Sequence, residues 1–170
     1  FGAAWIEQFA LEGITSGCGS GKFCPNDYVT RAQIAIFLLK GKHGSTYVPP
    51  AASGDFADVP VGSFAADWIE QLASEGVTAG CGGGNYCPDA TITRAQMAIF
   101  LLRGEHGSSY APPPATGTVF GDVPLGSFAD AWIEQLAAEG VTSGCGGGNY
   151  CPDANVTRAE MAVFLVRAFS

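Results

Sequence analysis

The chain has 170 residues and a formal net charge of −8, with 47% hydrophobic and only 14% charged residues. This apolar content excludes a disordered polyelectrolyte, and the lack of a basic stripe argues against duplex nucleic acid as a partner. No apolar stretch approaches the roughly 18 residues of a membrane-spanning helix, so we expect no membrane span.

A repeat with a period of 63 to 64 residues organises the chain. It is clearest in VTAGCGGGNYCPDATITRAQMAIFLLR at 77–103, which recurs in similar form at 14–40 and 141–167. Each unit is short, so its own core would be marginal, and we expect the units to share one core. The predicted units are 1–41, 55–104 and 119–170, joined by linkers at 42–54 and 105–118.

Each unit opens on a predicted amphipathic helix. In the second unit, Phe64, Trp68 and Leu72 fall on one helical face and Glu70 lies away from it. A serine stands at the N-cap position of the second and third copies, and a glycine closes all three. The pattern predicts helices at 2–11, 64–75 and 128–139, with Ser63 and Ser127 as caps and Gly13, Gly76 and Gly140 as closing residues.

A glycine-rich loop between two cysteines follows each of these helices. The two cysteines are separated by five residues in every unit, so the chain has six cysteines in three equally spaced pairs. An even number of cysteines at a repeated spacing indicates disulfides and an oxidising, extracellular location. Zinc is the competing interpretation, but each unit offers two cysteines and at most one histidine, whereas zinc usually takes four ligands. The loops serve either stability or a rigid binding edge. We expect disulfides Cys18–Cys24, Cys81–Cys87 and Cys145–Cys151, and no metal or cofactor.

A Thr-Arg pair introduces a second predicted helix in each unit. The threonine has Gln or Glu three residues later, which is the spacing of a capping box. The residues that follow, for example 95–102, are apolar nearly all round, as in a core helix. Three such helices in one chain should therefore meet each other. The capping pairs are Thr30 with Gln33, Thr93 with Gln96, and Thr157 with Glu160.

Linkers rich in Pro, Ala and Gly, such as VPPAASG at 48–54, separate the units and should be extended and semi-rigid. After each linker comes a short strand-like segment, F-x-D-V-P, at 56–60 and 120–124. The first unit has no such segment.

Together, the F-x-D-V-P segment, the aromatic-led helix, G-V/I-T-x-G, the Y/F-x-P loop and V/I-T-R-A-E/Q before an apolar helix resemble the S-layer homology domain. The resemblance covers nearly the whole chain apart from the linkers, and three tandem copies are the usual number in that family. It implies a mainly α fold, with three helix-loop-helix repeats forming one pseudo-threefold helical bundle with projecting loops. The cysteine pairs and the missing first F-x-D-V-P segment depart from the family pattern.

The resemblance implies a non-catalytic module that anchors an exported protein at the cell surface. Its expected partner is a cell-wall polysaccharide, namely a secondary cell-wall polymer that is often pyruvylated and is attached to peptidoglycan. The sequence shows no catalytic triad, metal cluster or phosphate loop, so we expect no enzyme. The alternative is a structural subunit of a surface layer or filament whose repeats assemble with copies of itself.

An arginine at the first position of each second helix opposes the helix dipole, at a cost of about 0.3–1 kcal/mol. A helix N-terminus with free N–H groups, a threonine hydroxyl and a guanidinium would form an anion site. The alternative is a structural ion pair with Asp58 or Asp122. The resemblance favours a ligand, since this arginine matches the family's ligand-contacting motif, and the candidates are Thr30, Arg31, Thr93, Arg94, Thr157 and Arg158.

Aromatic and amide side chains supply further candidates. Tryptophans on the first helices are possible stacking platforms for sugar rings, although their spacing favours core packing. Aromatic residues on the loops between the paired cysteines, called the clamped loops below, are less easily explained as core. The neighbouring asparagines are placed to reach sugar hydroxyls. These residues are Trp5, Trp68, Trp132, Phe23, Tyr86, Tyr150, Asn85 and Asn149.

Overall fold

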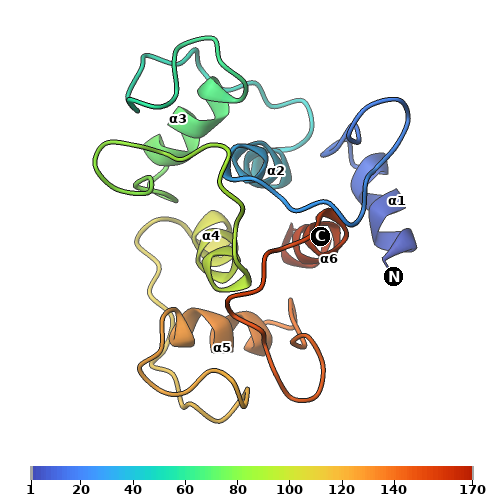
Figure 1. Cartoon of the computed structure of the whole chain (residues 1–170), viewed down its shortest axis with the longest axis vertical. Coiled ribbons are helices and arrows are strands. Elements are labelled where there is room, and N and C mark those ends of the chain that lie inside the picture. Colours follow the sequence, from blue (N-terminus) through green and yellow to red (C-terminus); the bar gives the residue numbers. More distant parts are fainter. Residues whose placement is uncertain (1, 170) are drawn as a thin grey trace.

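The computed structural model describes residues 2–169, which form six helices in one bundle (Figure 1). Three long central helices lie together in the middle, and three shorter outer helices surround them. Isolated bridges are the only extended pairing in residues 2–169, so the predicted mainly α class is confirmed. The central helices are α2 (Arg31–His43), α4 (Arg94–His106) and α6 (Arg158–Phe169); the outer ones are α1 (Ala3–Leu11), α3 (Ala66–Ser74) and α5 (Asp130–Ala138).

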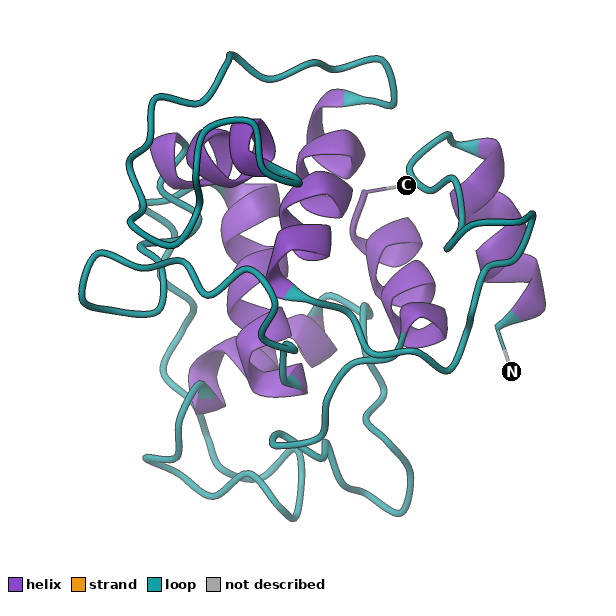
Figure 2. Ribbon diagram, turned by 45° about the horizontal axis from the view of Figure 1, so that its top comes forward, coloured by secondary structure: helices purple, strands orange, loops and turns teal. Residues whose placement is uncertain are grey.

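Each outer helix packs on the central helix of the preceding repeat, α3 on α2 and α5 on α4. Helix α1 completes the circle by packing on α6, so the first and last helices of the chain lie side by side (Figures 1 and 2). The three central helices also pack on one another, and their buried faces belong to a single apolar cluster. The prediction of one shared core is therefore confirmed, and the repeats interlock. No helix in residues 2–169 has the length and apolar character that crossing a membrane requires.

A ring of three backbone hydrogen bonds lies where the central helices begin. The N–H of Val29 donates to the carbonyl of Val156 (2.9 Å), Val156 to Ile92 (2.9 Å), and Ile92 to Val29 (3.1 Å). All three side chains are fully buried. Because the ring closes only when all three repeats are present, it joins them into one unit.

The predicted capping boxes of the central helices are confirmed. The Thr30 hydroxyl accepts a hydrogen bond from the Gln33 N–H (3.3 Å), and the Gln33 side chain accepts one from the Thr30 N–H (3.2 Å). Thr93 with Gln96 and Thr157 with Glu160 repeat this arrangement.

The serine caps predicted for the outer helices are wrong. Helix α3 begins after Ala65, which has a left-handed φ of 61°, and α5 begins after Ala129 with a φ of 63°; neither start has a side-chain cap. Ser63 contributes its carbonyl instead, which accepts a hydrogen bond from the Ala66 N–H (3.1 Å). Phe64, predicted on the buried face, precedes the helix and is 68% exposed. The closing glycines are as predicted, with φ between 69° and 75°: Gly13, Gly76 and Gly140.

Glu70, predicted to face away from the core, is buried and fixes the first linker. Its carboxylate accepts hydrogen bonds from the N–H groups of Ser53 (2.6 Å), Gly54 (2.7 Å) and Asp55 (2.8 Å). Glu134 fixes the second linker in the same way. Helices α2 and α4 continue into the first residues of the predicted linkers.

The six cysteines form the three predicted disulfides. The second cysteine of each pair has a left-handed backbone conformation, with φ values of 55°, 59° and 60° for Cys24, Cys87 and Cys151. An L-residue pays roughly 1–2 kcal/mol for this conformation. The disulfide therefore holds each loop in a shape that its second cysteine would not adopt freely.

We expect Ile92→Ala to lower the free energy of unfolding by about 2–5 kcal/mol, because it opens a cavity beside the backbone ring. The whole chain should still unfold in one transition, as followed by circular dichroism during urea unfolding. Leu125→Ala, at a 68% exposed position, is the control and should change stability by less than about 0.5 kcal/mol. Separate transitions for the repeats would contradict the shared core.

Removing one disulfide should cost roughly 2 kcal/mol, because a short closed loop then gains freedom in the unfolded chain. Thermal unfolding of Cys81→Ala/Cys87→Ala tests this. The matched variant Cys81→Ala/Cys87→Gly should be more stable than the alanine pair by about 1 kcal/mol, since glycine adopts the left-handed conformation freely. Equal stability of the two variants would show that the backbone at position 87 relaxes.

Candidate functional site

Two grooves of the same design lie between neighbouring repeats. The first groove, of about 180 Å³, has Arg158 and Lys40 among its lining residues, with Phe64 and the segment 15–17. The second groove, of about 150 Å³, is lined by the corresponding basic residues and segment of other repeats: Arg94, Arg167 and 142–144, with Trp5 and Glu160. Each groove thus contains one basic residue from the start of a central helix and one from the end of another.

The arginine that begins each central helix is almost fully buried, with 6%, 3% and 4% of its surface exposed for Arg31, Arg94 and Arg158. The Arg31 Nε donates to the carbonyl of Tyr86 (2.7 Å), and its guanidinium lies 4.7 Å from the centre of the Tyr86 ring. The arginine therefore joins α2 to the clamped loop of the next repeat. The same contacts join Arg94 to Tyr150 and Arg158 to Phe23.

Part of this guanidinium surface is unused. The Nη2 atoms of Arg31 and Arg94 are buried and have no hydrogen-bond partner among the described residues. Nη1 of Arg94 pairs with Glu160 (3.0 Å), and Nη2 of Arg158 lies 3.4 Å from the Thr15 hydroxyl. Burial lowers the pKa of Arg31 and of Arg158. A buried donor without a partner costs about 1–3 kcal/mol, and a carboxylate oxygen would satisfy it.

The free helix N–H groups expected at this site are not free. The N–H of Arg31 donates to the carbonyl of Ala90 (2.9 Å) and that of Ala32 to the carbonyl of Pro88 (2.9 Å), both in the turn that follows Cys87 in the next repeat. Helices α4 and α6 are capped in the same way. The hydroxyls of the capping threonines accept from the next N–H groups of the helix. An anion would therefore meet the guanidinium and not the helix N-terminus.

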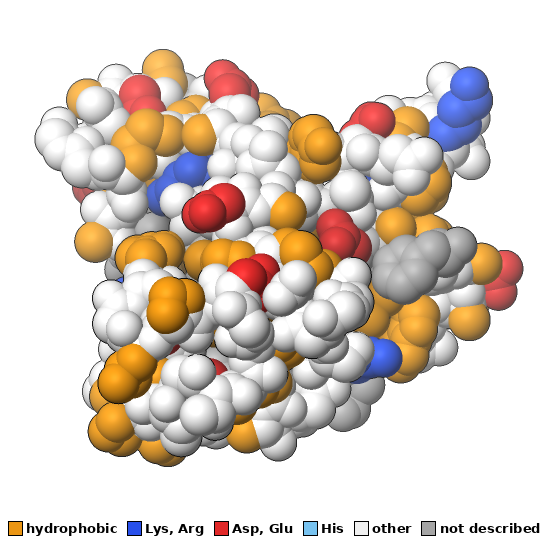
Figure 3. All heavy atoms as spheres, turned by 60° about the horizontal axis from the view of Figure 1, so that its bottom comes forward, with side chains coloured by type: hydrophobic (Ala, Val, Ile, Leu, Met, Phe, Trp, Pro, Cys, Tyr) orange, Lys and Arg blue, Asp and Glu red, His pale blue; other side chains and the backbone are white. Residues whose placement is uncertain are grey.

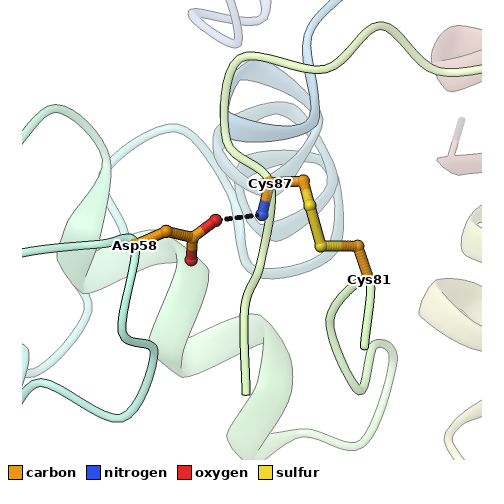
Figure 4. Close-up of side chains that lie close together, drawn as sticks. All are labelled: Asp58, Cys81 and Cys87. Carbon is orange, nitrogen blue, oxygen red and sulfur yellow. Dashed lines mark hydrogen bonds between the residues drawn. A yellow bond between two sulfur atoms is a disulfide. The ribbon is translucent and has the colours of Figure 1, made fainter. Parts of the chain in front are cut away.

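Asp58 holds the clamped loop instead of pairing directly with Arg31. Its two carboxylate oxygens accept hydrogen bonds from the N–H groups of Tyr86 and Cys87, at 2.7 Å each, and Figure 4 shows the bond to Cys87 beside the Cys81–Cys87 disulfide. Burial raises the pKa of Asp58, but these bonds and the nearby Arg31 outweigh it, so the pKa lies below its ordinary value. Asp122 repeats the arrangement in the third repeat. The F-x-D-V-P segment that carries each aspartate is a turn, not the predicted strand.

Tyr86 and Tyr150, whose place on the glycine-rich loops does not indicate core residues, are fully buried. The Tyr86 hydroxyl donates to the carbonyl of Arg31 (2.7 Å), and Tyr150 does the same to Arg94 (2.7 Å). Burial raises the pKa of both phenols. These rings hold the arginines in place and are closed to a ligand.

The tryptophans are half-buried, and each lies beside the basic residue near the end of a central helix. Only Trp5 is among the lining residues of the two grooves. Asn85 and Asn149 close the turns of the clamped loops through their backbones and line neither groove. The pairs are Lys40 over Trp68 (5.9 Å), Arg103 over Trp132 (5.3 Å) and Arg167 over Trp5 (5.2 Å).

Several groove residues were missed from the sequence. Lys40 and Arg167 follow their helix-starting arginines by nine residues, as Arg103 does, and this recurrence was the available signal. Thr15 and Phe64 come from segments whose sequence pattern indicates only structural roles.

Replacing Asp58 by Asn should destabilise the fold by about 2–3 kcal/mol near neutral pH, because charge-assisted hydrogen bonds to two N–H groups are lost or weakened. The folded-state pKa of Asp58 is lowered, so its contribution is complete above the unfolded pKa of 3.8 and is lost as the pH falls through the lower folded value. The Asp58→Asn variant should therefore lose less stability than the parent chain between pH 4 and pH 2. Parallel acid-unfolding curves for both chains would contradict this assignment.

Comparison with known proteins identifies the repeats. The S-layer homology domain family matches residues 10–35, 55–98 and 119–162. An amylopullulanase of Thermoanaerobacterium thermosulfurigenes is 30% identical over 94% of this chain and 8% of its own length. Cell surface glycoprotein 1 of Acetivibrio thermocellus is 28% identical over 89% of this chain and 7% of its own. A cellulosome-anchoring protein of the same species is 26% identical, over 89% and 34%.

The chain spans only 7% to 34% of the length of these relatives, so the match to an enzyme covers a small part of that enzyme. Surface proteins recur among the relatives, including an S-layer protein of Bacillus licheniformis. S-layer homology domains anchor surface proteins to the cell wall, and the location of this module is the cell surface. With one matched segment in each of its three repeats, the chain belongs to the S-layer homology domain family.

Proposed function

We propose that this chain is a non-catalytic anchoring module that binds an anionic secondary cell-wall polymer, attached to peptidoglycan, in the grooves between its repeats. The observation that supports this most is at Arg94, which lines the second groove and whose Nη2 is buried without a hydrogen-bond partner among the described residues. A carboxylate, such as that of a pyruvyl group on a sugar, would accept hydrogen bonds there. The Nε bond to the clamped loop fixes each arginine before the ligand arrives, so little ordering is required on binding.

The distribution of charge supports an anionic ligand despite the net charge of −8. Six of the eight basic residues occupy two positions on the central helices, the first residue and the residue nine places later: Arg31, Lys40, Arg94, Arg103, Arg158 and Arg167. Four of these line the two grooves, whereas acidic and apolar side chains spread over the face in Figure 3 with few basic ones. At physiological salt the Debye length is about 8 Å, so the local cations outweigh distant carboxylates.

The groove walls are suited to sugar rings. Phe64 is exposed at the first groove and Trp5 is half-exposed at the second. Aromatic faces of this kind bury the apolar face of a sugar, while segments 15–17 and 142–144 offer hydroxyl and backbone polar groups beside them. We infer that the polymer lies along the groove with its anionic group at the arginine.

Assembly of copies into a surface layer is the second candidate function. One observation favours it: Ile6, Ala10 and Phe23 help to line an open hollow of about 380 Å³ on the first repeat. An apolar segment of a second copy would fit this hollow.

Co-sedimentation with cell walls tests both functions. The parent chain should pellet with walls and stay in solution after the wall polymer is removed chemically. Glu160→Gln should bind more tightly, by about tenfold, because it removes a negative charge 3.0 Å from Arg94 Nη1. The fold should tolerate this change, since Gln33 and Gln96 occupy the same capping position in the other repeats.

Arg94→Lys keeps the positive charge but loses the planar fork, so it should weaken binding in a chain that circular dichroism shows to be folded. Unchanged binding by both Glu160→Gln and Arg94→Lys would contradict binding of the polymer in the groove that contains Arg94. Pelleting of the chain without walls, in proportion to its concentration, would favour assembly instead.

A further inference from the structure

The repeat design places two equivalent clusters where a central helix ends against the end of an outer helix. The first junction lies between α2 and α3 and contains Lys42, His43 and Glu75. The second junction lies between α4 and α5 and contains Glu105, His106 and Glu139. Neither junction contributes a lining residue to the grooves described above.

The two junctions share a framework. In the first, the His43 Nε2 lies 2.7 Å from the Glu75 Oε1, and the Gln71 amide donates to the same oxygen (2.9 Å). In the second, the corresponding distances to the Glu139 Oε1 are 2.9 Å from His106 and 2.7 Å from Gln135. Each imidazole also packs against a tyrosine ring at 4.4 Å, which orients it: Tyr47 and Tyr110.

One substitution separates the junctions. In the first, the Lys42 ammonium donates to the second oxygen of Glu75 (2.9 Å). In the second, Glu105 replaces the lysine, and the Oε2 atom of Glu139 is buried with no hydrogen-bond partner among the described residues. The second junction therefore lacks a cation at the point where the first junction has one.

Negative charge is concentrated at the second junction. Glu139 caps the C-terminus of α5, and Glu105 lies in the last turn of α4, so two carboxylates meet at the negative ends of two helix dipoles. Carboxylates in this arrangement are stabilised by a bound cation.

We propose that the second junction binds a divalent metal ion of the zinc class through the carboxylates of Glu105 and Glu139 and the Nε2 of His106. One ligand atom from each residue lies within 4.8 Å of the others, and His106 Nε2 is 4.0 Å from Glu105 Oε2. Zinc takes nitrogen and oxygen ligands at about 2.0–2.2 Å, often three from protein with water in the fourth position, so small side-chain movements close the site. All three side chains are partly exposed, which gives the ion access. Calcium, with six to eight oxygen ligands, fits an imidazole-containing site less well.

A metal in this position would join the end of the second repeat's central helix to the third repeat's outer helix. The first junction makes the corresponding connection with the Lys42–Glu75 ion pair. The metal would therefore make the stability of one inter-repeat contact depend on the ionic composition outside the cell.

Calorimetric titration of the tag-free chain with zinc chloride, near pH 7 and with the disulfides intact, tests the proposal. The parent chain should bind one zinc ion, and zinc should raise its melting temperature. Glu105→Lys rebuilds the charge pattern of the first junction, so the fold should persist while zinc affinity falls at least tenfold. Glu139→Gln should also lower the affinity at least tenfold.

The reciprocal change gives the sharpest control. Lys42→Glu copies the second junction into the first and should raise the stoichiometry from one zinc ion to two. Absence of saturable zinc binding by the parent chain would overturn the proposal, as would equal affinity in Glu105→Lys.

Discussion

The first N–H groups of the central helices set the architecture of this protein. A helix leaves these donors without partners inside itself, and here the helices begin at the buried centre of the bundle. Thr30 supplies one acceptor from its own repeat, whereas Pro88 and Ala90 supply two from the next repeat. Because the loop of the first repeat caps α6 in turn, the dependence is circular and no repeat is complete alone. The disulfide, Asp58 and Arg31 all hold the loop between Cys81 and Cys87, which leads directly into Pro88 and Ala90, so they serve one structural purpose.

The sequence predicted what depends on residues close together in the chain. The capping boxes, the apolar central helices and the disulfides each follow from spacings of six residues or fewer. It did not predict that α3 packs on α2, because an outer helix presents the same apolar face whether it packs on its own central helix or on a neighbour's. The serine caps failed for a local reason. Ala65 has a left-handed backbone conformation. The sequence does not indicate this conformation, since alanine rarely adopts it.

The arginines of the candidate site could be predicted, but their surroundings could not. Spacing places Arg31 at the start of a helix, and the structure adds that Nε and the helix N–H groups are already used by the next repeat. The proposed anion site is thereby reduced to one edge of a guanidinium. The rest of each groove comes from other repeats, as Lys40 and Phe64 do at Arg158. Such proximity arises from the circular packing and leaves no trace in the local sequence.

The pseudo-threefold design also explains where the three repeats are free to differ. Residues that take part in the circular capping, such as the central arginines and the buried rings against them, are bound to similar roles because each repeat completes its neighbour. The Gln or Glu at the third position of each central helix, and the residues at the helix ends, carry no such constraint. There, Gln33 becomes Glu160 beside an arginine, and Lys42 becomes Glu105 beside a carboxylate. Both changes alter charge without altering backbone geometry, so we expect the grooves and junctions of the three repeats to differ in their affinity for ions.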